Sequence, residues 1–411
     1  MFGSFQKKQK RKFLEIFSIN MARHFFISLI FISLFISCTR QKDVNPVSHK
    51  VNEIEVIETT VFIDPILIRA QEIVSFMNDS LLVSQVLISG IDGRGSLPPY
   101  VIEMLNKVPS GGVMFFRYNL NTSNEDIKNL TGETVSLIKK KSDIPPFIAV
   151  DHEGGTVNRF LSGVADLPDA STYWDIFQKE GRDEALSKIE EDSFRAASVI
   201  NELGFNMNFA PVSEYLNDDN RDFLLRRSYG SDPFFTSQAA EAFLKSMQKA
   251  GVLCVIKHFP VSAGADPHFS VSVINREIDE LDMLTLPFIY LINNGARAIM
   301  TAHTCIPSLD SRIASLSPAV MQDWIKDDLE FSGIIIADDF TMAAAGDIDL
   351  YEAAVQSISA GADMILVWPA YLERTHSALM TALEEGTLPR DRLLDAVQRI
   401  IYEKLKMGLM D

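Results

Sequence analysis

The sequence predicts an α/β fold in which eight β/α units form a single (β/α)8 barrel of the TIM type. Three observations lead to this prediction. Short apolar runs rich in Val and Ile recur eight times along the chain. Gly or Pro bounds the runs, and the segments between them are long enough to be crossover helices. Strands that are apolar on both faces are typical of a parallel sheet that is covered by helices.

The expected strands follow one another in the order of the chain. They lie at residues 81–90, 111–119, 145–155, 205–215, 252–260, 296–304, 333–340 and 362–369. Helical periodicity is clearest in two of the segments between them, at residues 243–250 and 317–329, where Ser317 is a plausible N-cap before Pro318. An open doubly wound sheet is the alternative, but no Gly-x-Gly-x-x-Gly follows any of the runs.

The N-terminal segment resembles an export signal. Arg23 and His24 precede an apolar run at residues 25–36, which is short for a membrane span but suits a signal peptide, and Ser37 and Cys38 follow. We therefore expect a bacterial lipoprotein signal at residues 1–38 that ends at a lipidated Cys38, a tether at residues 39–65 and the barrel at residues 66–411. An uncleaved anchor helix is the alternative, and both interpretations place the body outside the cytoplasmic membrane.

Charge is distributed unevenly between this segment and the body. The first fifty residues hold nine Lys or Arg and two Asp or Glu, which leaves 29 basic and 53 acidic side chains for the remainder. An acidic surface repels phosphate backbones, so we expect no nucleic-acid partner, and membrane contact only through the lipid. The sequence does not indicate an oligomeric state.

Polar residues gather where the apolar runs end. These residues are Asp92, Arg117, Asp151, Glu214, Lys257, His258, His303, Asp338 and Asp339. The loops at the carboxyl ends of the strands converge in a barrel, and active sites are built there. A single aspartate at such a position commonly caps the next helix, but capping requires neither a lysine nor an arginine.

Two kinds of chemistry are compatible with these residues. Four histidines, His152, His258, His268 and His303, lie at or beyond strand ends, but no His-x-His pair occurs and Lys257 adjoins His258, so we expect no metal and no cofactor. Hydrolysis of an acetal requires a carboxylate nucleophile and a proton donor on opposite sides of a sugar. Asp338, at the end of a rigid strand, suits the nucleophile, and Asp339 would point elsewhere.

Seven motifs extend this interpretation to a family. They are "AVDHEGGTVNRF", "NFAPVSEY", "RRSYGSDP", "KHFP…DPH", "IMTAH", "SLSP" and "GIIIADDFTMAA", in this order. From about residue 70 onward the chain resembles the glycoside hydrolase family 3 β-N-acetylglucosaminidases of the NagZ type.

The resemblance implies a role for each matching residue. Asp338 matches the nucleophile that forms a covalent glycosyl-enzyme, His268 matches the histidine acid/base, and Asp266 matches its partner aspartate. The residues that hold the innermost sugar are matched by Asp151, Arg159, Arg227, Lys257 and His258. The implied function is that of a retaining exo-β-N-acetylglucosaminidase acting on peptidoglycan fragments or related glycans.

The chain departs from the family pattern in the loop that carries the expected acid/base. Val261, Ser262 and Ala263 replace a Gly-His-Gly, Pro267 replaces a serine, and Glu214 stands where an aspartate is common. Two alternatives therefore remain open. One is another retaining activity, either that of a β-glucosidase or that of a phosphorylase, and the other is a glycan-binding lipoprotein without catalysis.

Overall fold

The computed structural model describes residues 64–262, 272–341 and 348–411. The expected signal, Cys38 and the tether as far as residue 63 lie outside this part of the chain, as do Asp266 and His268. Within the described residues, no helix combines the length and the apolar character that a membrane span requires.

Eight parallel strands close into a barrel, in which each strand pairs with its neighbours in chain order. The strands are β1 (Leu87–Gly90), β2 (Gly112–Phe115), β3 (Phe147–Val150), β4 (Met207–Asn208), β5 (Leu253–Phe259), β7 (Ala298–Thr301), β10 (Ile334–Ala337) and β11 (Met364–Val367). Each falls within one of the eight predicted segments, so the predicted barrel is confirmed.

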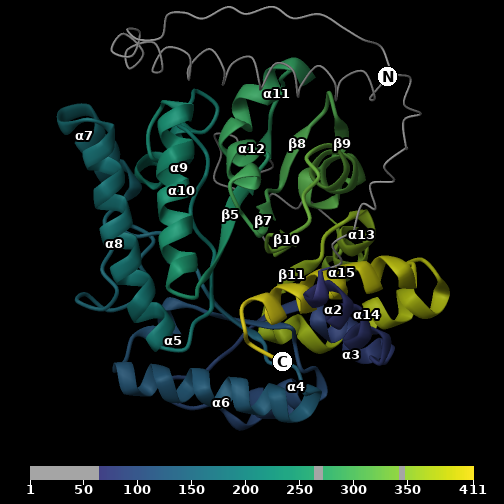
Figure 1. The fold of residues 1–411 in the computed structure, drawn as a ribbon. Helices are drawn as coiled ribbons and strands as arrows, with labels where there is room; N and C mark the ends of the chain where they lie inside the picture. Colours follow the sequence, from purple (N-terminus) through teal and green to yellow (C-terminus); the bar gives the residue numbers. More distant parts are fainter. Residues whose placement is uncertain (1–63, 263–271, 342–347) are drawn as a thin grey trace, which may run out of the picture. The chain divides into compact units, whose positions relative to one another are not determined.

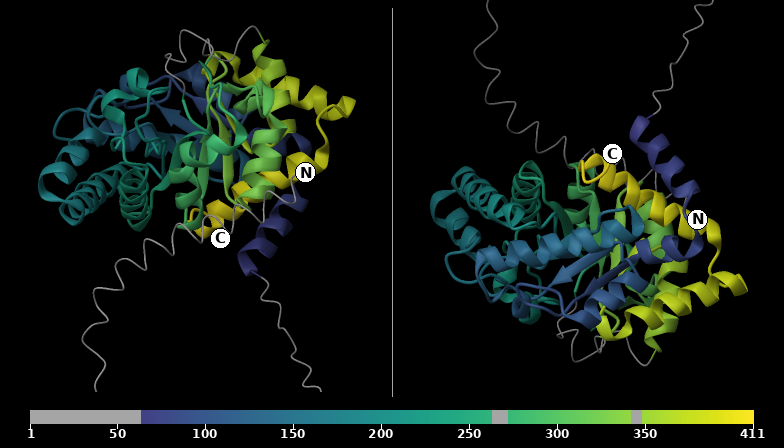
Figure 2. Two further views of the ribbon diagram at one scale, coloured as in Figure 1. Left: turned by 90° about the horizontal axis from the view of Figure 1, so that it is seen from above. Right: turned by 90° about the horizontal axis from the view of Figure 1, so that it is seen from below.

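Helices surround the strands in all views (Figures 1 and 2). In the first half of the body they are α2 (Pro65–Ser75), α3 (Asp79–Gln85), α4 (Pro99–Lys107), α5 (Arg117–Leu120), α6 (Asn124–Ser142), α7 (Ala170–Glu180), α8 (Arg182–Glu202), α9 (Arg221–Leu224), η1 (Leu225–Arg227) and α10 (Pro233–Lys249). In the second half they are α11 (Ile278–Leu284), α12 (Leu286–Asn293), η2 (Ala314–Leu316), η3 (Ala319–Asp328), α13 (Leu350–Ala360), η5 (Pro369–Tyr371), α14 (Leu372–Glu385) and α15 (Arg390–Lys406).

The first and last helices of the body pack side by side. In Figure 1 the purple α2 and α3 lie against the yellow α14 and α15. The hydroxyl of Tyr402 on α15 donates to Asp64 Oδ2 at 2.8 Å, at the start of α2. The last helix, α15, therefore contacts Asp64, the first described residue.

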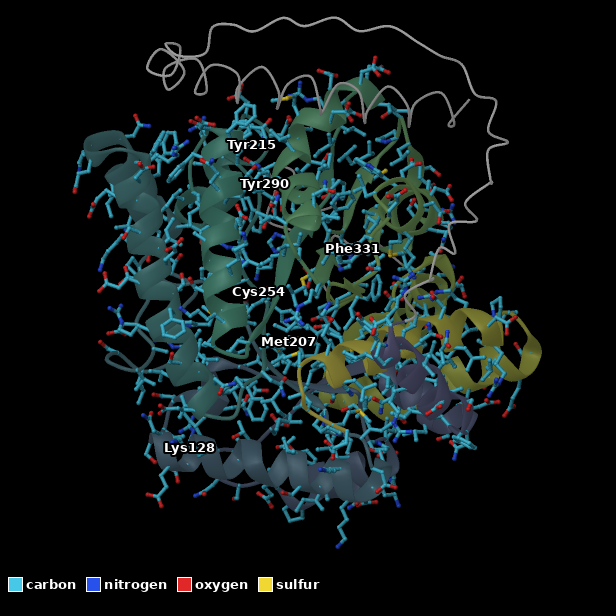
Figure 3. The ribbon with its side chains drawn as sticks, in the orientation of Figure 1. Lys128, Met207, Tyr215, Cys254, Tyr290 and Phe331 are labelled. Atoms are coloured by element: carbon cyan, nitrogen blue, oxygen red, sulfur yellow. The ribbon has the colours of Figure 1, made fainter. Side chains whose placement is uncertain are left out.

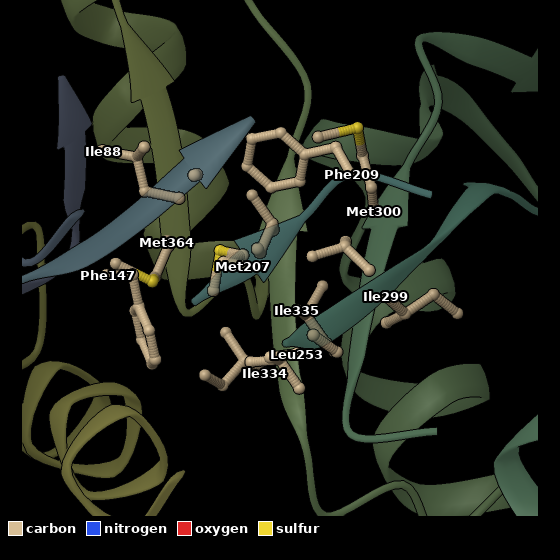
Figure 4. Packing of buried hydrophobic residues seen from close by; sticks show 14 of the residues in the cluster. Ile88, Phe147, Met207, Phe209, Leu253, Ile299, Met300, Ile334, Ile335 and Met364 are labelled. Atoms are coloured by element: carbon tan, nitrogen blue, oxygen red, sulfur yellow. The ribbon is translucent and has the colours of Figure 1, made fainter. Parts of the chain in front are cut away.

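Apolar side chains from the strands fill the barrel. Figure 4 shows Ile88, Phe147, Met207, Leu253 and Met364, which come from five different strands, packed in one cluster. In Figure 3, by contrast, Lys128 projects outward from α6. This continuous apolar packing holds the strand ends, and the polar residues that follow them, in fixed positions.

Two local predictions need correction. The predicted strand at residues 81–90 is helical at its start, because α3 extends to Gln85 and only β1 is extended. An apolar run cannot by itself distinguish a buried helix from a strand. The predicted helix at residues 317–329 is a π-helix, although Ser317 Oγ accepts the N–H of Val320 at 3.2 Å, as an N-cap does.

A second, small sheet lies beyond the barrel strands. It contains β6 (Ser272–Val273), β8 (Thr304–Ile306) and β9 (Asp310–Ile313). β6 pairs with β8 in parallel, and the N–H of Ile274 donates to the carbonyl of Cys305 at 2.9 Å. The chain that re-enters the described part at Ser272 is therefore held beside the segment that follows β7.

A buried charge network lies at the amino ends of the barrel strands. Asp363, just before β11, accepts hydrogen bonds from Lys326 Nζ at 3.0 Å, Arg392 Nη2 at 2.5 Å and the N–H of Ile335 at 2.9 Å. Its side chain is fully buried. The network joins η3 and α15 to the amino end of β11.

We expect Asp363→Ala to lower the free energy of unfolding by about 3–5 kcal/mol, because two buried cations lose their partner. Urea unfolding followed by circular dichroism measures this change. Glu384→Gln, at an exposed position on α14, should unfold at the wild-type midpoint. An Asp363→Ala variant as stable as Glu384→Gln would show that the network does not stabilise the barrel.

Candidate active site

One buried ammonium group meets two carboxylates at the carboxyl ends of β3 and β5. Lys257 Nζ lies 2.5 Å from Asp151 Oδ1 and 2.6 Å from Glu153 Oε1. The lysine side chain is only 4% exposed, and burying such a charge without partners is strongly unfavourable. The contacts therefore tie the turn after β3 to β5.

Two arginines complete this charged cluster. Arg159 Nη2 lies 2.5 Å from Asp151 Oδ2, and Arg227 donates from Nε and Nη2 to the two oxygens of Glu153 at 2.7 and 2.8 Å. Such a bidentate pair is strong and specific in its geometry. Three cations thus face two anions, and the buried Nε of Arg159 has no hydrogen-bond partner among the described residues.

Both carboxyl groups of the cluster favour the ionised form. Burial raises the pKa of Asp151, but Lys257 and Arg159 outweigh it, so the pKa of this carboxyl lies below its usual range. Burial also raises the pKa of Glu153. The charges of Lys257 and Arg227 outweigh this effect, so the pKa of Glu153 is lowered as well. The cluster therefore keeps its charges at neutral pH.

Two glycines shape the turn that presents these carboxylates. Gly154 and Gly155 have φ angles of 99° and 50°, in the left-handed region. A Cβ on Gly155 would lie 1.8 Å from Asp169 Oδ1, which accepts the N–H of Thr156 at 2.8 Å. The "DHEGG" sequence can adopt this turn because neither glycine has a side chain.

His258 is held by a second buried carboxylate. Its Nδ1 lies 2.8 Å from Glu214 Oε1, and its backbone N–H donates to the same oxygen at 3.2 Å. Glu214 also accepts from Ser262, from the backbone N–H at 2.5 Å and from Oγ at 2.9 Å. Burial raises the pKa of Glu214, but these hydrogen bonds, with that of His258 the strongest, hold it below its usual range.

Two departures from the family pattern therefore contact each other. By the resemblance described above, Glu214 stands where an aspartate is common, and Ser262 stands in place of the first loop histidine. The longer glutamate carries its carboxylate to the hydroxyl of Ser262. Glu214 thus links Ser262 to His258, which is one of the predicted sugar-binding residues.

The two adjacent aspartates after β10 have different environments. Asp339 accepts the N–H of Thr341 at 2.9 Å, the hydroxyl of Thr341 at 2.7 Å and the indole N–H of Trp368. Burial, and to a lesser degree Asp338, raise the pKa of Asp339. Within the described residues, the one hydrogen bond to the Asp338 carboxylate comes from the N–H of Asp339 at 2.8 Å. Of the two aspartates, Asp338 is therefore the one with a carboxylate oxygen that accepts no hydrogen bond from the described part of the chain.

Three of the four strand-end histidines are described, and each has a protein partner. His152 Nε2 donates to the carbonyl of Ala165 at 2.9 Å, and burial lowers the pKa of His152 to about 4. His303 Nε2 donates to the carbonyl of Asp339 at 2.9 Å. No group of three or more metal-binding side chains occurs among the residues that the structure describes.

The predicted site residues are thus partly brought together. Asp151, Arg159 and Lys257 are in direct contact, Arg227 joins them through Glu153, and His258 is oriented by Glu214. Asp338 lies at the end of β10, whereas Asp266 and His268 lie outside the described residues. Glu153 was not among the predicted site residues, and Glu214 was named as a strand-end residue but was given no role in the site, although both lie within the quoted motifs. Their positions beside Lys257 and His258 become evident only when the strand ends are brought together.

This combination of a closed parallel barrel with ionised and imidazole groups at its carboxyl ends defines a TIM-barrel enzyme. The family model described as the glycosyl hydrolase family 3 N terminal domain matches residues 82–402. The chain belongs to this family, as the sequence motifs indicate, and it is a glycoside hydrolase.

Similar proteins agree with this assignment. A β-hexosaminidase of Neisseria gonorrhoeae is 34% identical over 261 residues, which cover 62% of this chain and 71% of the relative. The structure of NagZ from the same organism, in complex with N-trifluoroacetyl-D-glucosamine, has a TM-score of 0.66 at 26% identity and covers 78% of this chain and 97% of that chain. A family 3 β-N-acetylglucosaminidase from a Paenibacillus species has a TM-score of 0.75 at 27% identity over 81% of this chain. This chain spans 63% of the Paenibacillus protein.

We expect Glu153→Gln to be less stable than the wild type by about 3 kcal/mol at pH 7, because Lys257 and Arg227 lose an ionised partner. The folded-state pKa of Glu153 is lowered, so its stabilisation is present above the unfolded value of about 4.3 and is lost as the pH falls below it. Urea unfolding between pH 3 and 7 should show the two proteins converging in acid.

Glu190→Gln, on the exposed face of α8, is the matched control. Its difference from the wild type should stay small throughout this range. A Glu153→Gln variant whose deficit is the same at pH 3 and pH 7 would contradict a role for the ionised carboxylate.

Proposed function

We propose that this chain is a retaining exo-β-N-acetylglucosaminidase that removes terminal GlcNAc from peptidoglycan fragments or related glycans. The observation that carries the proposal is the presence of two features at one end of the barrel. A cluster of charged groups, built on Lys257, lies at the carboxyl ends of β3 and β5, and among the described residues the Asp338 carboxylate accepts a hydrogen bond only from the N–H of Asp339.

Each feature has a place in the proposed reaction. Asp151, Arg159 and Lys257 bind hydroxyl groups of the terminal sugar through charge-assisted hydrogen bonds. Asp338 attacks the anomeric carbon and forms a covalent glycosyl-enzyme. His268, paired with Asp266, protonates the leaving oxygen and then removes a proton from water, for which an imidazole pKa of about 6.5 is suitable.

The choice of sugar rests on the similar proteins. One is called a β-hexosaminidase, and another was solved with an N-acylated glucosamine derivative. The charged cluster alone would also accept a β-glucoside, and a histidine acid/base would also admit phosphate as the acceptor. These alternatives, and that of a glycan-binding protein without catalysis, differ from the proposal in measurable products.

The purified chain should release nitrophenol from the aryl β-N-acetylglucosaminide in preference to the aryl β-glucoside. Retention predicts that NMR detects β-GlcNAc as the first product, because two displacements at the anomeric carbon restore its configuration. Added phosphate should yield no sugar phosphate. Release of α-GlcNAc would contradict the proposed mechanism, and release from neither substrate would favour the glycan-binding alternative.

Asp338→Ala should lose this activity, and added azide should restore it with the α-glycosyl azide as product, because a single displacement inverts the anomeric centre. His268→Ala should lose roughly 10²–10⁴-fold with a sugar leaving group and far less with nitrophenol, which needs no proton. An Asp338→Ala variant as active as the wild type would exclude this aspartate as the nucleophile.

We further propose that the enzyme is exported and anchored to a bacterial membrane through a lipid on Cys38. The support is the apolar run before Ser37 and Cys38, followed by a polar segment. Cells that express the wild type should incorporate labelled palmitate into the protein and retain it in the membrane fraction. Cys38→Ala should remain unlabelled, and equal labelling of the two proteins would refute the lipoprotein assignment.

A further inference from the structure

Three aromatic rings stack at the carboxyl ends of β2 and β11. The ring of Phe116 lies between those of Trp368, at a centroid distance of 4.6 Å, and Tyr118, at 5.8 Å. The ring planes deviate from parallel by only 9° and 14°. We refer to Trp368, Phe116 and Tyr118 as the aromatic track.

A glycine on the strand between them allows the rings to meet. β1 pairs with both β2 and β11, and it ends at Gly90. A Cβ at this position would lie 3.0 Å from Phe116 Cε2 and 3.3 Å from Pro369 Cδ. A larger residue would therefore push the two sides of the stack apart.

The inner end of the aromatic track reaches the candidate nucleophile. The indole N–H of Trp368 donates to Asp339 Oδ2, and the backbone N–H of Asp339 donates to Asp338 Oδ1 at 2.8 Å. Two hydrogen bonds through Asp339 therefore connect the ring of Trp368 to the carboxylate of Asp338.

The outer end is exposed, yet it is fixed in position. Tyr118 is 40% exposed, and its hydroxyl donates to the carbonyl of Ile91 at 2.9 Å. Its own carbonyl accepts from Arg94 Nε and Nη2 at 3.1 and 2.9 Å. Nearby, the exposed Tyr100 donates its hydroxyl to Asp92. A ring that is immobilised at both ends loses little conformational entropy when a ligand packs against it.

The barrel mouth therefore has two chemically different sides. The charged cluster lies over β3 and β5, and the aromatic track lies over β2, β1 and β11, next to the β10 strand that carries Asp338. Hydroxyl groups suit the first side. The C–H face of a pyranose ring is apolar, and it suits the flat faces of aromatic side chains, which also offer polar edges for hydroxyl groups.

We infer that the aromatic track binds the leaving-group side of the glycan, with a pyranose ring packed on the exposed ring of Tyr118. This inference rests on the proposed function, in which the charged cluster holds the terminal sugar. The enzyme would then favour a substrate whose terminal GlcNAc is attached to another sugar.

The test compares two substrates that differ only in their leaving group. One is the disaccharide N,N′-diacetylchitobiose, and the other is the β-azide of GlcNAc, whose leaving group is too short to reach the track. An aromatic contact of ordinary strength predicts that Tyr118→Leu lowers the ratio of the two kcat/KM values, disaccharide over azide, by about threefold to tenfold. Tyr118→Phe, which keeps the ring, should restore most of the ratio.

Phe194→Leu is the matched control, because Phe194 is 41% exposed but lies on α8, outside the aromatic track. Its ratio should equal that of the wild type. If Tyr118→Leu lowers both kcat/KM values equally, the stack serves only to pack the protein and the inference fails. If Tyr118→Leu does not fold, as judged by circular dichroism, Tyr118→Met, which also lacks the ring, takes its place, and the same fall in the ratio is expected.

A wild type that cleaves neither substrate would refute the proposed function. The aromatic track would then be tested by the binding of chitobiose. Chitobiose should then change the fluorescence of the wild type, in which Trp368 is one of three tryptophans. Tyr118→Leu should weaken this binding by about threefold to tenfold. No binding, or equal affinity in the two proteins, would overturn the inference.

Discussion

The ammonium group of Lys257 lies buried between the carboxylates of Asp151 and Glu153, and the rest of the site depends on this contact. A buried charge must be paired, so the turn after β3 is drawn onto β5. The two carboxylates in turn pair with Arg159, which lies further along the same loop, and with Arg227, which comes from the segment between β4 and α10. One requirement, that no charge be left without a partner, therefore fixes the positions of five side chains.

The two sides of the barrel mouth suit a reaction that separates two sugars. In the proposed reaction, the charged side donates to the hydroxyl groups of one ring, and the aromatic side presents flat apolar surfaces to the other. Asp338 stands on the strand beside the aromatic track, and Asp339 joins the two through Trp368. The Trp368 side chain, which completes the stack, thus also holds Asp339, the residue next to the proposed nucleophile.

The barrel could be predicted because its signal is local and repeated. Each strand is a short apolar run, and a polar residue such as Asp151 or Asp338 marks the end of most of these runs. The errors were also local: residues 81–83 are apolar but belong to a helix, and the apolar pattern at residues 317–329 does not distinguish an α-helix from a π-helix. The quoted motifs contain residues at the carboxyl ends of strands, and the barrel brings some of these residues together, as Lys257 and Asp151 show.

The sequence by itself determined the order of the strands, the family and the residues whose chemistry suits a sugar. Only the tertiary structure decided which of these residues are partners. Glu153 is linked to Arg227, and Phe116 to Trp368, across long stretches of chain, so no spacing in the sequence indicates either contact. The physical reason is that pairing of charges and stacking of rings depend on distances through space, which are set by the closure of the barrel.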